Sequence, residues 1–295
     1  MARRRQFGIA AALTTPFSGG LIDIARLCRH AVASLDRGCD RIALFGTTGE
    51  GPSVGLGERR PVLEALKANG VGGDRLSLGI TVSAVDDALA EAHLAAEFGV
   101  ESLLITPPHY YKDVSPSAVR DWFAAFLAAL PRPGPRVILY NIPQVTGVAI
   151  PADVVAALTA QFADRILGVK DSSGEWDSAE RLLTRFPDLA ILIGDERLLE
   201  RAVGLGADGS ISGIANFRPD LLNAIMNSAP ADAGLVALVD AILRFPATPA
   251  VKALVAHVTG EAGWRAVRPP LSALSEAEAA GLSATYERLL ARMVA

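Results

Sequence analysis

Short apolar runs alternate with longer amphipathic stretches along the first three-quarters of the chain. The runs are apolar at nearly every position, which is typical of strands in a parallel sheet that is covered on both faces. Eight of them predict strands, at 8–13, 41–45, 76–81, 102–106, 136–140, 166–170, 190–193 and 209–212. The stretches between them have helical length and period, for example 86–98 and 151–162. The pattern therefore predicts repeated strand–helix units.

Helix-start signals support these boundaries. Asp23 precedes the first amphipathic stretch, Ser115-Pro116 opens the fourth, and Pro151 opens the fifth. Eight such units predict a closed (β/α)8 TIM barrel, which takes about 250 residues. A doubly wound open sheet is the alternative, but the first strand is followed by Leu13-Thr14-Thr15-Pro16-Phe17 and not by a glycine-rich dinucleotide fingerprint.

The pattern changes near residue 228, after the break Ser228-Ala229-Pro230. Beyond it only helical periodicity remains, at 231–244, 249–259 and 275–293. We therefore expect a barrel domain over residues 1–228 and a C-terminal helical appendage over 229–295.

Composition narrows the class of protein. Of 295 residues, 51% are hydrophobic and 20% are charged, so the chain can bury a large core. A net charge of −4 gives no reason to expect nucleic acid or an anionic membrane as partner. No apolar run approaches the 18 residues of a membrane span, and 7–13 is too short for a secretory signal, so we expect a cytoplasmic protein.

Cysteine and histidine spacing argues against a metal. Cys28 and Cys39 do not form a CxxC motif, and in a reducing cytoplasm they are expected to be free, buried thiols. The four histidines lack metal-ligand spacing. We expect no metal and no cofactor.

Polar residues gather where the predicted strands end, which is the catalytic face of such a barrel. The second strand is followed by Gly46-Thr47-Thr48-Gly49-Glu50-Gly51, a loop whose N–H groups and hydroxyls could all point at one anion, or an ordinary tight turn. His109-Tyr110-Tyr111 follows the fourth strand, where a tyrosine pair more often packs than reacts. Tyr140 ends the fifth strand, pointing at the barrel mouth or plugging the core.

Lysine is scarce, which limits amine chemistry. The chain has 28 basic residues but only four lysines, Lys67, Lys112, Lys170 and Lys252. Of these, only Lys170 ends a barrel strand. Burial disfavours the ammonium form, and a neutral amine is what Schiff-base chemistry needs. Pairing with Asp171, or an outward orientation, is the structural alternative.

The residues together suggest one reaction. Imine formation needs protons to be shuttled near the lysine, and a tyrosine hydroxyl bonded to a threonine and a second tyrosine could do so. The Gly-Thr-Thr loop could hold a carboxylate beside the carbonyl. The implied substrate is a 2-oxo acid.

Three motifs carry a resemblance to a known family. Gly46-Thr47-Thr48-Gly49-Glu50, Tyr140-Asn141-Ile142-Pro143-x-x-Thr146-Gly147 and Gly168-Val169-Lys170-Asp171 resemble, in order and spacing, the dihydrodipicolinate synthase / N-acetylneuraminate lyase family of class I aldolases. The resemblance covers essentially the whole chain. It implies a (β/α)8 barrel with C-terminal helices and a Schiff base between Lys170 and pyruvate or another 2-oxo acid.

The resemblance also assigns roles. Tyr140 matches the general acid/base, Thr47 the relay threonine, and Thr48, with the backbone beside it at Gly46, the carboxylate site. Tyr111 matches a relay tyrosine that reaches into the neighbouring subunit, which implies a homotetramer of tight dimers. Gly209 and Ile211 match the eighth-strand segment that lies against the bound 2-oxo acid.

Substrate choice departs from the best-known members. The synthase has an arginine for aspartate semialdehyde where this chain has Val145, so an apolar group replaces a carboxylate clamp. Sialate lyases have an acidic residue where Arg197 stands and a serine where Gly213 stands. The small hydroxyls beside Lys170 resemble those of relatives that act on 2-keto-3-deoxy sugar acids. The contacts expected for substrate hydroxyls are Ser172, Asp195 and Glu196.

The hypothesis is therefore an aldolase or lyase that acts on a 2-oxo acid, a 2-keto-3-deoxy sugar acid or a similar compound, and reversibly gives pyruvate and an aldehyde without a cofactor. A dehydratase that expels a C4 hydroxyl through the same imine is the close rival. Dihydrodipicolinate synthesis is disfavoured by Val145. A non-catalytic 2-oxo acid sensor and a phosphate-binding barrel are the more distant alternatives.

Overall fold

The computed structural model describes residues 7–231 and 233–293, and eight parallel strands form its centre. They close into a barrel in the order β1-β10-β9-β8-β7-β6-β5-β4. The strands are β1 (Gly8–Ala12), β4 (Arg41–Leu44), β5 (Leu76–Ile80), β6 (Ser102–Ile105), β7 (Arg136–Asn141), β8 (Ile166–Asp171), β9 (Ala190–Ile193) and β10 (Gly209–Ser212). The predicted barrel and all eight predicted strands are confirmed, with ends that differ by at most one residue.

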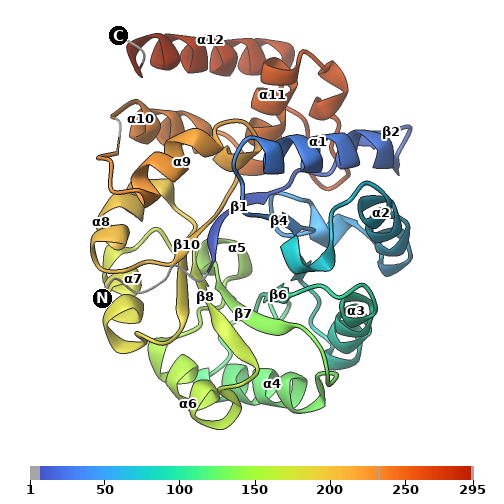
Figure 1. Cartoon of the computed structure of the whole chain (residues 1–295), viewed down its shortest axis with the longest axis vertical. Coiled ribbons are helices and arrows are strands. Elements are labelled where there is room, and N and C mark those ends of the chain that lie inside the picture. The colour runs from blue at the N-terminus through green and yellow to red at the C-terminus, as the bar shows by residue number, and fades with distance from the viewer. Residues whose placement is uncertain (1–6, 232, 294–295) are drawn as a thin grey trace.

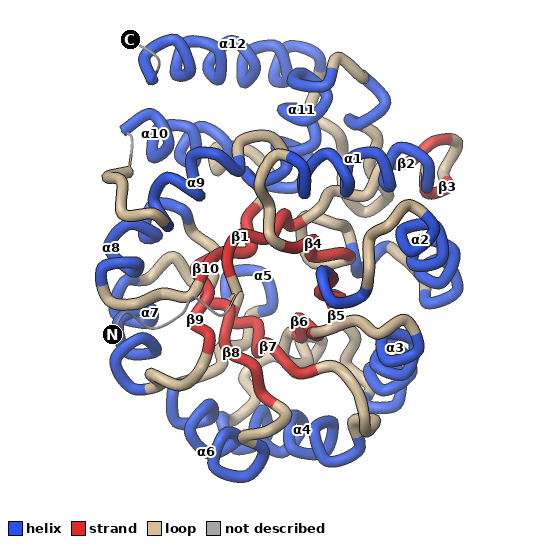
Figure 2. The backbone as a smooth tube through the Cα atoms, viewed as in Figure 1, coloured by secondary structure: helices blue, strands red, loops and turns tan. Residues whose placement is uncertain are grey.

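A ring of helices surrounds the strands (Figures 1 and 2). One helix follows each strand: α1 (Ile24–Asp36), α2 (Leu56–Ala68), α3 (Val85–Glu97), α4 (Pro116–Ala129), α6 (Ala152–Phe162), α7 (Trp176–Arg185), α8 (Leu199–Gly204) and α9 (Pro219–Met226). The expected starts are confirmed: Asp23 accepts a hydrogen bond from the Arg26 amide, Ser115 accepts one from the Ala118 amide, and Pro151 precedes α6.

Two short features were not predicted. A two-stranded hairpin, β2 (Phe17–Ser18) and β3 (Leu21–Ile22), lies between β1 and α1, and the single turn α5 (Pro143–Thr146) follows β7. Both are shorter than the window over which periodicity can be recognised.

Three helices complete the chain: α10 (Ala233–Ile242), α11 (Ala247–Thr259) and α12 (Glu276–Met293). In Figure 1 they lie together on one side of the barrel, near α1 and α9. Their apolar side chains, such as Leu238, Leu254 and Leu282, belong to the same core cluster as the outer faces of the strands. The division of the chain into two domains at residue 228 stays a prediction.

The barrel interior forms a second, smaller core. Alternate strand residues fill it, among them Ala10, Leu104, Ile138, Leu192 and Ile211. Cys28 and Cys39 are buried and free, as expected. No single described helix is long and apolar enough to cross a membrane; only α10 and α11 taken together meet that criterion, and they bend by 118° at their junction.

Asn216, just after β10, fastens the barrel to α1. Its side-chain oxygen accepts from the Thr14 amide and lies 3.1 Å from His30 Nε2, and its amide nitrogen donates to Ala12 O. The ring of His30 packs against Trp264 at 4.7 Å between centroids. Burial lowers the pKa of His30 to about 4, so its neutral form is the one that fits.

We expect this histidine to make the fold sensitive to acid. Because the folded-state pKa lies below the usual 6.5, the unfolded chain binds the proton first, and stability falls as the pH drops from about 6.5 to about 4, by roughly 3 kcal/mol in total. The variant His30→Gln can still donate to Asn216 but does not titrate. Urea unfolding at several pH values should show a shallower acid loss in His30→Gln, and parallel curves would contradict this assignment.

Candidate active site

A cavity of about 410 Å³ opens at the carboxyl ends of the strands. Its walls come from the segments that follow β4, β7, β8, β9 and β10, together with side chains of α10 and α11. This is the face of a (β/α)8 barrel where catalytic groups gather. Of the residues predicted for the site, it is lined by Thr47, Thr48, Tyr140, Lys170, Ser172, Asp195, Glu196 and Ile211.

Lys170 and Tyr140 lie side by side at the cavity floor. They are paired residues on the neighbouring strands β8 and β7, and their side chains are 5% and 3% exposed. Lys170 Nζ lies 4.3 Å from the centre of the Tyr140 ring. The lysine therefore points inward, and the outward orientation is wrong.

Asp171 does not neutralise this lysine. Its carboxylate accepts hydrogen bonds from Asn141 Nδ2 at 2.8 Å and from Ser173 Oγ at 3.1 Å. Because consecutive strand residues face opposite sides, Asp171 braces β7 and β8 from outside the barrel interior while Lys170 faces the cavity. The amine is thus placed to meet a ligand.

The Tyr140 hydroxyl is hydrogen-bonded to a second hydroxyl. It lies 3.3 Å from Thr47 Oγ1, on the loop that follows β4. Either oxygen can donate in this pair, so a proton can pass along it. Lys170, Tyr140 and Thr47 together offer an amine with a proton relay at its side.

The loop of residues 46–51 is a tight turn that presents Thr47 and Thr48. The backbone N–H groups of Glu50 and Gly51 donate back to Thr47 O and Gly46 O. The expectation that every N–H in this loop could point at one anion is therefore wrong for these two. Thr48 stays available and faces Gly213, where an added Cβ would lie 3.8 Å from its Oγ1.

A buried ion pair holds this loop in place. Lys252 Nζ on α11 lies 2.5 Å from Glu50 Oε1, and both side chains are 0% exposed. The same ammonium donates to Thr15 O, and the Arg268 amide donates to Glu50 Oε2. Burial lowers the pKa of Lys252, and the hydrogen bond that it donates to Glu50 opposes that shift.

Sequence reasoning missed this role of Lys252. A second contact from the same helix strengthens the link, since Thr248 Oγ1 donates to Thr47 O at 3.1 Å. The sequence does carry one sign of this burial, because Lys252 is the one polar residue in an otherwise apolar stretch from Pro249 to Ala256. A lysine in such a stretch is buried and needs a partner.

Tyr110 and Tyr111 lie apart from the cavity. They stand on the loop after β6 and are 79% and 73% exposed, with their rings edge to face at 5.3 Å. They are therefore not packed into their own chain. Gly46 and Gly209 are also absent from the described cavity lining; Gly209 begins β10 and packs closely against Gly8.

The residues that are predicted to contact substrate hydroxyls differ in how far their side chains are already bonded within the chain. Ser172 Oγ adjoins Gly194, where an added Cβ would also lie 3.0 Å from Lys170 Cε, so both side chains border this glycine. Glu196 accepts a hydrogen bond from Ser212, and burial raises the pKa of its carboxyl. Asp195 is engaged by Arg197.

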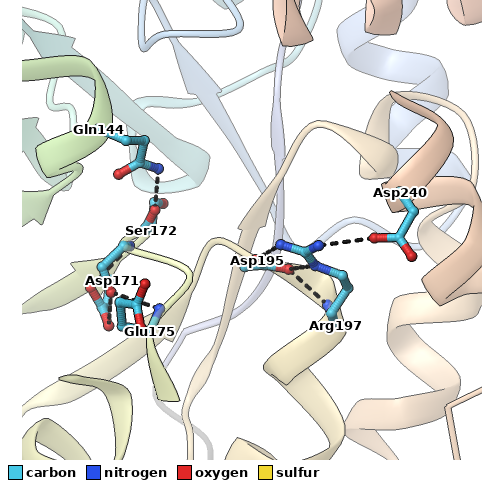
Figure 3. A network of polar contacts seen from close by, with 8 residues as sticks. Gln144, Asp171, Ser172, Glu175, Asp195, Arg197 and Asp240 are labelled. Atoms are coloured by element: carbon cyan, nitrogen blue, oxygen red, sulfur yellow. Dashed lines mark hydrogen bonds and ion pairs between the residues drawn. The ribbon is translucent and has the colours of Figure 1, made fainter. Parts of the chain in front are cut away.

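Figure 3 shows this engagement. The Arg197 guanidinium lies between Asp195, at 2.6 Å, and Asp240 of α10, at 2.9 Å. Its charge is balanced within the chain. Among the described residues, no three His, Cys, Asp or Glu side chains gather where they could hold a metal ion.

Comparison with known proteins identifies the family of this chain. The model of the dihydrodipicolinate synthetase family matches residues 5–289. An uncharacterized DapA-like lyase of Chloroflexus aurantiacus is 36% identical over 293 residues, which is 96% of this chain and 97% of the relative. The 4-hydroxy-tetrahydrodipicolinate synthase 1 of Streptomyces coelicolor is 33% identical, with 95% of this chain and 93% of the relative covered.

A solved structure agrees closely. The crystal structure of dihydrodipicolinate synthase from Agrobacterium tumefaciens has a TM-score of 0.94 and 43% sequence identity. The match covers 96% of this chain and 99% of that one.

We expect the variant Lys252→Met to lose about 3–5 kcal/mol of unfolding free energy, because it leaves the Glu50 carboxylate buried without its partner. The double variant Glu50→Gln/Lys252→Met carries neither charge and should recover most of that loss. Urea unfolding at neutral pH measures both, with Lys67→Met on the surface of α2 as control. A double variant no more stable than the single one would contradict the role of the charge.

Proposed function

The chain belongs to the dihydrodipicolinate synthetase family, and we propose that it is a class I aldolase that cleaves a 2-oxo acid to pyruvate and an aldehyde through an imine on Lys170. The observation that carries the proposal is the inward-facing amine of Lys170 against Tyr140, which is in turn bonded to Thr47. A buried amine beside a proton relay is what carbonyl chemistry without a cofactor requires.

The reaction begins with attack of the neutral Lys170 amine on the C2 carbonyl. Tyr140 protonates the carbinolamine oxygen, which leaves as water, and the protonated imine remains. When the C3–C4 bond breaks, its electron pair moves into the imine, while Tyr140 and Thr47 take the proton of the C4 hydroxyl. The aldehyde leaves, C3 is protonated, and water then releases pyruvate from the lysine.

Carboxylate binding falls to the loop of residues 46–51. Thr48 and the backbone beside Gly46 hold the substrate carboxylate in this proposal, with Ile211 against the methyl or methylene carbon. Thr48 lines the cavity opposite Gly213, which supports the assignment. The buried pair of Glu50 and Lys252 keeps the loop at this position.

A second copy of the chain completes the relay in this proposal. Tyr111 is exposed in its own chain, so it is free to reach a neighbour. A further cavity of about 260 Å³ borders Thr47, and the buried Thr106 hydroxyl that lines it has no hydrogen-bond partner among the described residues. The homotetramer and the cytoplasmic location stay predictions.

Synthesis from aspartate semialdehyde is the second candidate, because two of the relatives carry the names of such synthases. Val145 argues against it, since that side chain borders the cavity, is 60% exposed and offers no charge to a carboxylate. Of the described residues that line the cavity, the one guanidinium is Arg197, and it is already paired.

Exchange of the pyruvate methyl protons with D2O, followed by NMR, tests the proposal with pyruvate alone. The imine acidifies C3, so wild-type enzyme should catalyse exchange, and Lys170→Ala should abolish it. Tyr140→Phe should slow exchange by about 100-fold to 10,000-fold, because it removes the proton-transfer group. Lys67→Ala, on the surface of α2, is the control and should exchange at the wild-type rate. Catalysed exchange in Lys170→Ala would refute the role of this lysine.

A further inference from the structure

One wall of the cavity is apolar. Val239 and Ile242 of α10, Leu243 directly after it, and Ala247 at the start of α11 supply this wall, and Val145 of α5 adds another apolar group to the lining. Val145 and Leu243 are 60% and 51% exposed, so the apolar surface of this wall is accessible to a ligand. Such a surface gains free energy when an apolar group covers it.

The charged and amide side chains near this wall already have hydrogen-bond partners within the chain. Arg197 donates to Asp195 through Nε and Nη2 and to Asp240 through Nη1, as Figure 3 shows. Gln144 donates its amide to Ser172 O at 2.5 Å. A ligand with several hydroxyl groups therefore finds few unengaged donors on this side of the cavity, since these side chains already bond one another.

The polar groups that remain lie near the reacting carbons. Ser172 Oγ adjoins Gly194, which the Lys170 side chain also borders, and Glu196 lines the same cavity as Lys170. A hydroxyl on C4 would meet these groups. Beyond C4 a substituent meets the apolar wall.

We propose that the aldehyde half of the substrate carries an apolar chain or ring, so that the 2-oxo acid is a 4-hydroxy-2-oxo acid with an apolar tail and not a polyhydroxylated sugar acid. This inference rests on the aldolase function proposed above. The cavity of about 410 Å³ falls within the range of sites that bind small organic molecules. In the synthetic direction, C3 of the pyruvate enamine adds to the aldehyde carbon, the aldehyde oxygen takes a proton, and water releases the product from Lys170.

A matched panel of aldehydes tests the proposal. Pyruvate is held constant, and butanal, benzaldehyde, glyceraldehyde and aspartate semialdehyde are compared by kcat/KM for aldol formation. We expect the two apolar aldehydes to exceed glyceraldehyde by at least about tenfold, the discrimination that a single methylene obtains in an apolar pocket.

Leu243→Gln should reduce this preference several-fold by making the wall polar. Leu56→Gln is the matched control, since Leu56 is also a partly exposed leucine, 42% accessible at the start of α2, but lies outside the described lining of the cavity. Both positions are exposed enough for the variants to fold.

The outcomes distinguish the aldolase function from the proposal that its substrate has an apolar tail. Absence of pyruvate methyl exchange in wild-type enzyme would refute the aldolase function itself. Normal exchange with a preference for glyceraldehyde or aspartate semialdehyde, or with equal rates for all four, would overturn the apolar tail and leave the aldolase intact. An apolar preference that Leu243→Gln and Leu56→Gln change equally would also overturn it.

Discussion

The buried ion pair between Glu50 and Lys252 is the constraint on which the site depends. It joins the loop after β4 to α11, two segments 202 residues apart in the chain. Two charges without water are costly unless each is fully bonded, and here Thr15 O and the Arg268 amide provide the remaining contacts. Because the loop carries Thr47 and Thr48, the C-terminal helices position groups of the barrel mouth as well as covering it.

The register of the barrel strands is a second constraint on where the reactive side chains lie. Parallel pairing sets Tyr140 beside Lys170 and Asn141 beside Asp171. Alternation then divides the four residues between two sides of the sheet: amine and phenol inward, carboxylate and amide outward. If Asp171 faced inward, it would neutralise Lys170. Because Asp171 directly follows Lys170 in β8, the two side chains lie on opposite sides of the sheet. The Asp171 carboxylate is bonded to Asn141, and the Lys170 amine faces the cavity.

The strands and Lys170 could be predicted because their signals are local. An apolar run of four to six residues marks a covered parallel strand, and a lysine at its end is conspicuous when only four lysines exist. The pairings of Lys252 and Arg197 could not be predicted in this way, because a local pattern can indicate that a charged residue needs a partner but not which distant residue supplies it. Glu50 is distant in sequence from Lys252, and Asp240 is distant from Arg197, whose other partner, Asp195, lies two residues away. Arg197 stands where the resemblance to sialate lyases predicts an acidic residue, and its charge is paired with Asp195 and Asp240.

Borohydride reduction in the presence of pyruvate, followed by peptide mapping, tests the central claim most directly. The reagent reduces an imine to a stable amine, so the mass increase of one peptide identifies the lysine that formed the imine. The account predicts that, with pyruvate, one lysine gains the reduced adduct and that it is Lys170. No adduct, or an adduct on Lys67, Lys112 or Lys252 in its place, would contradict it.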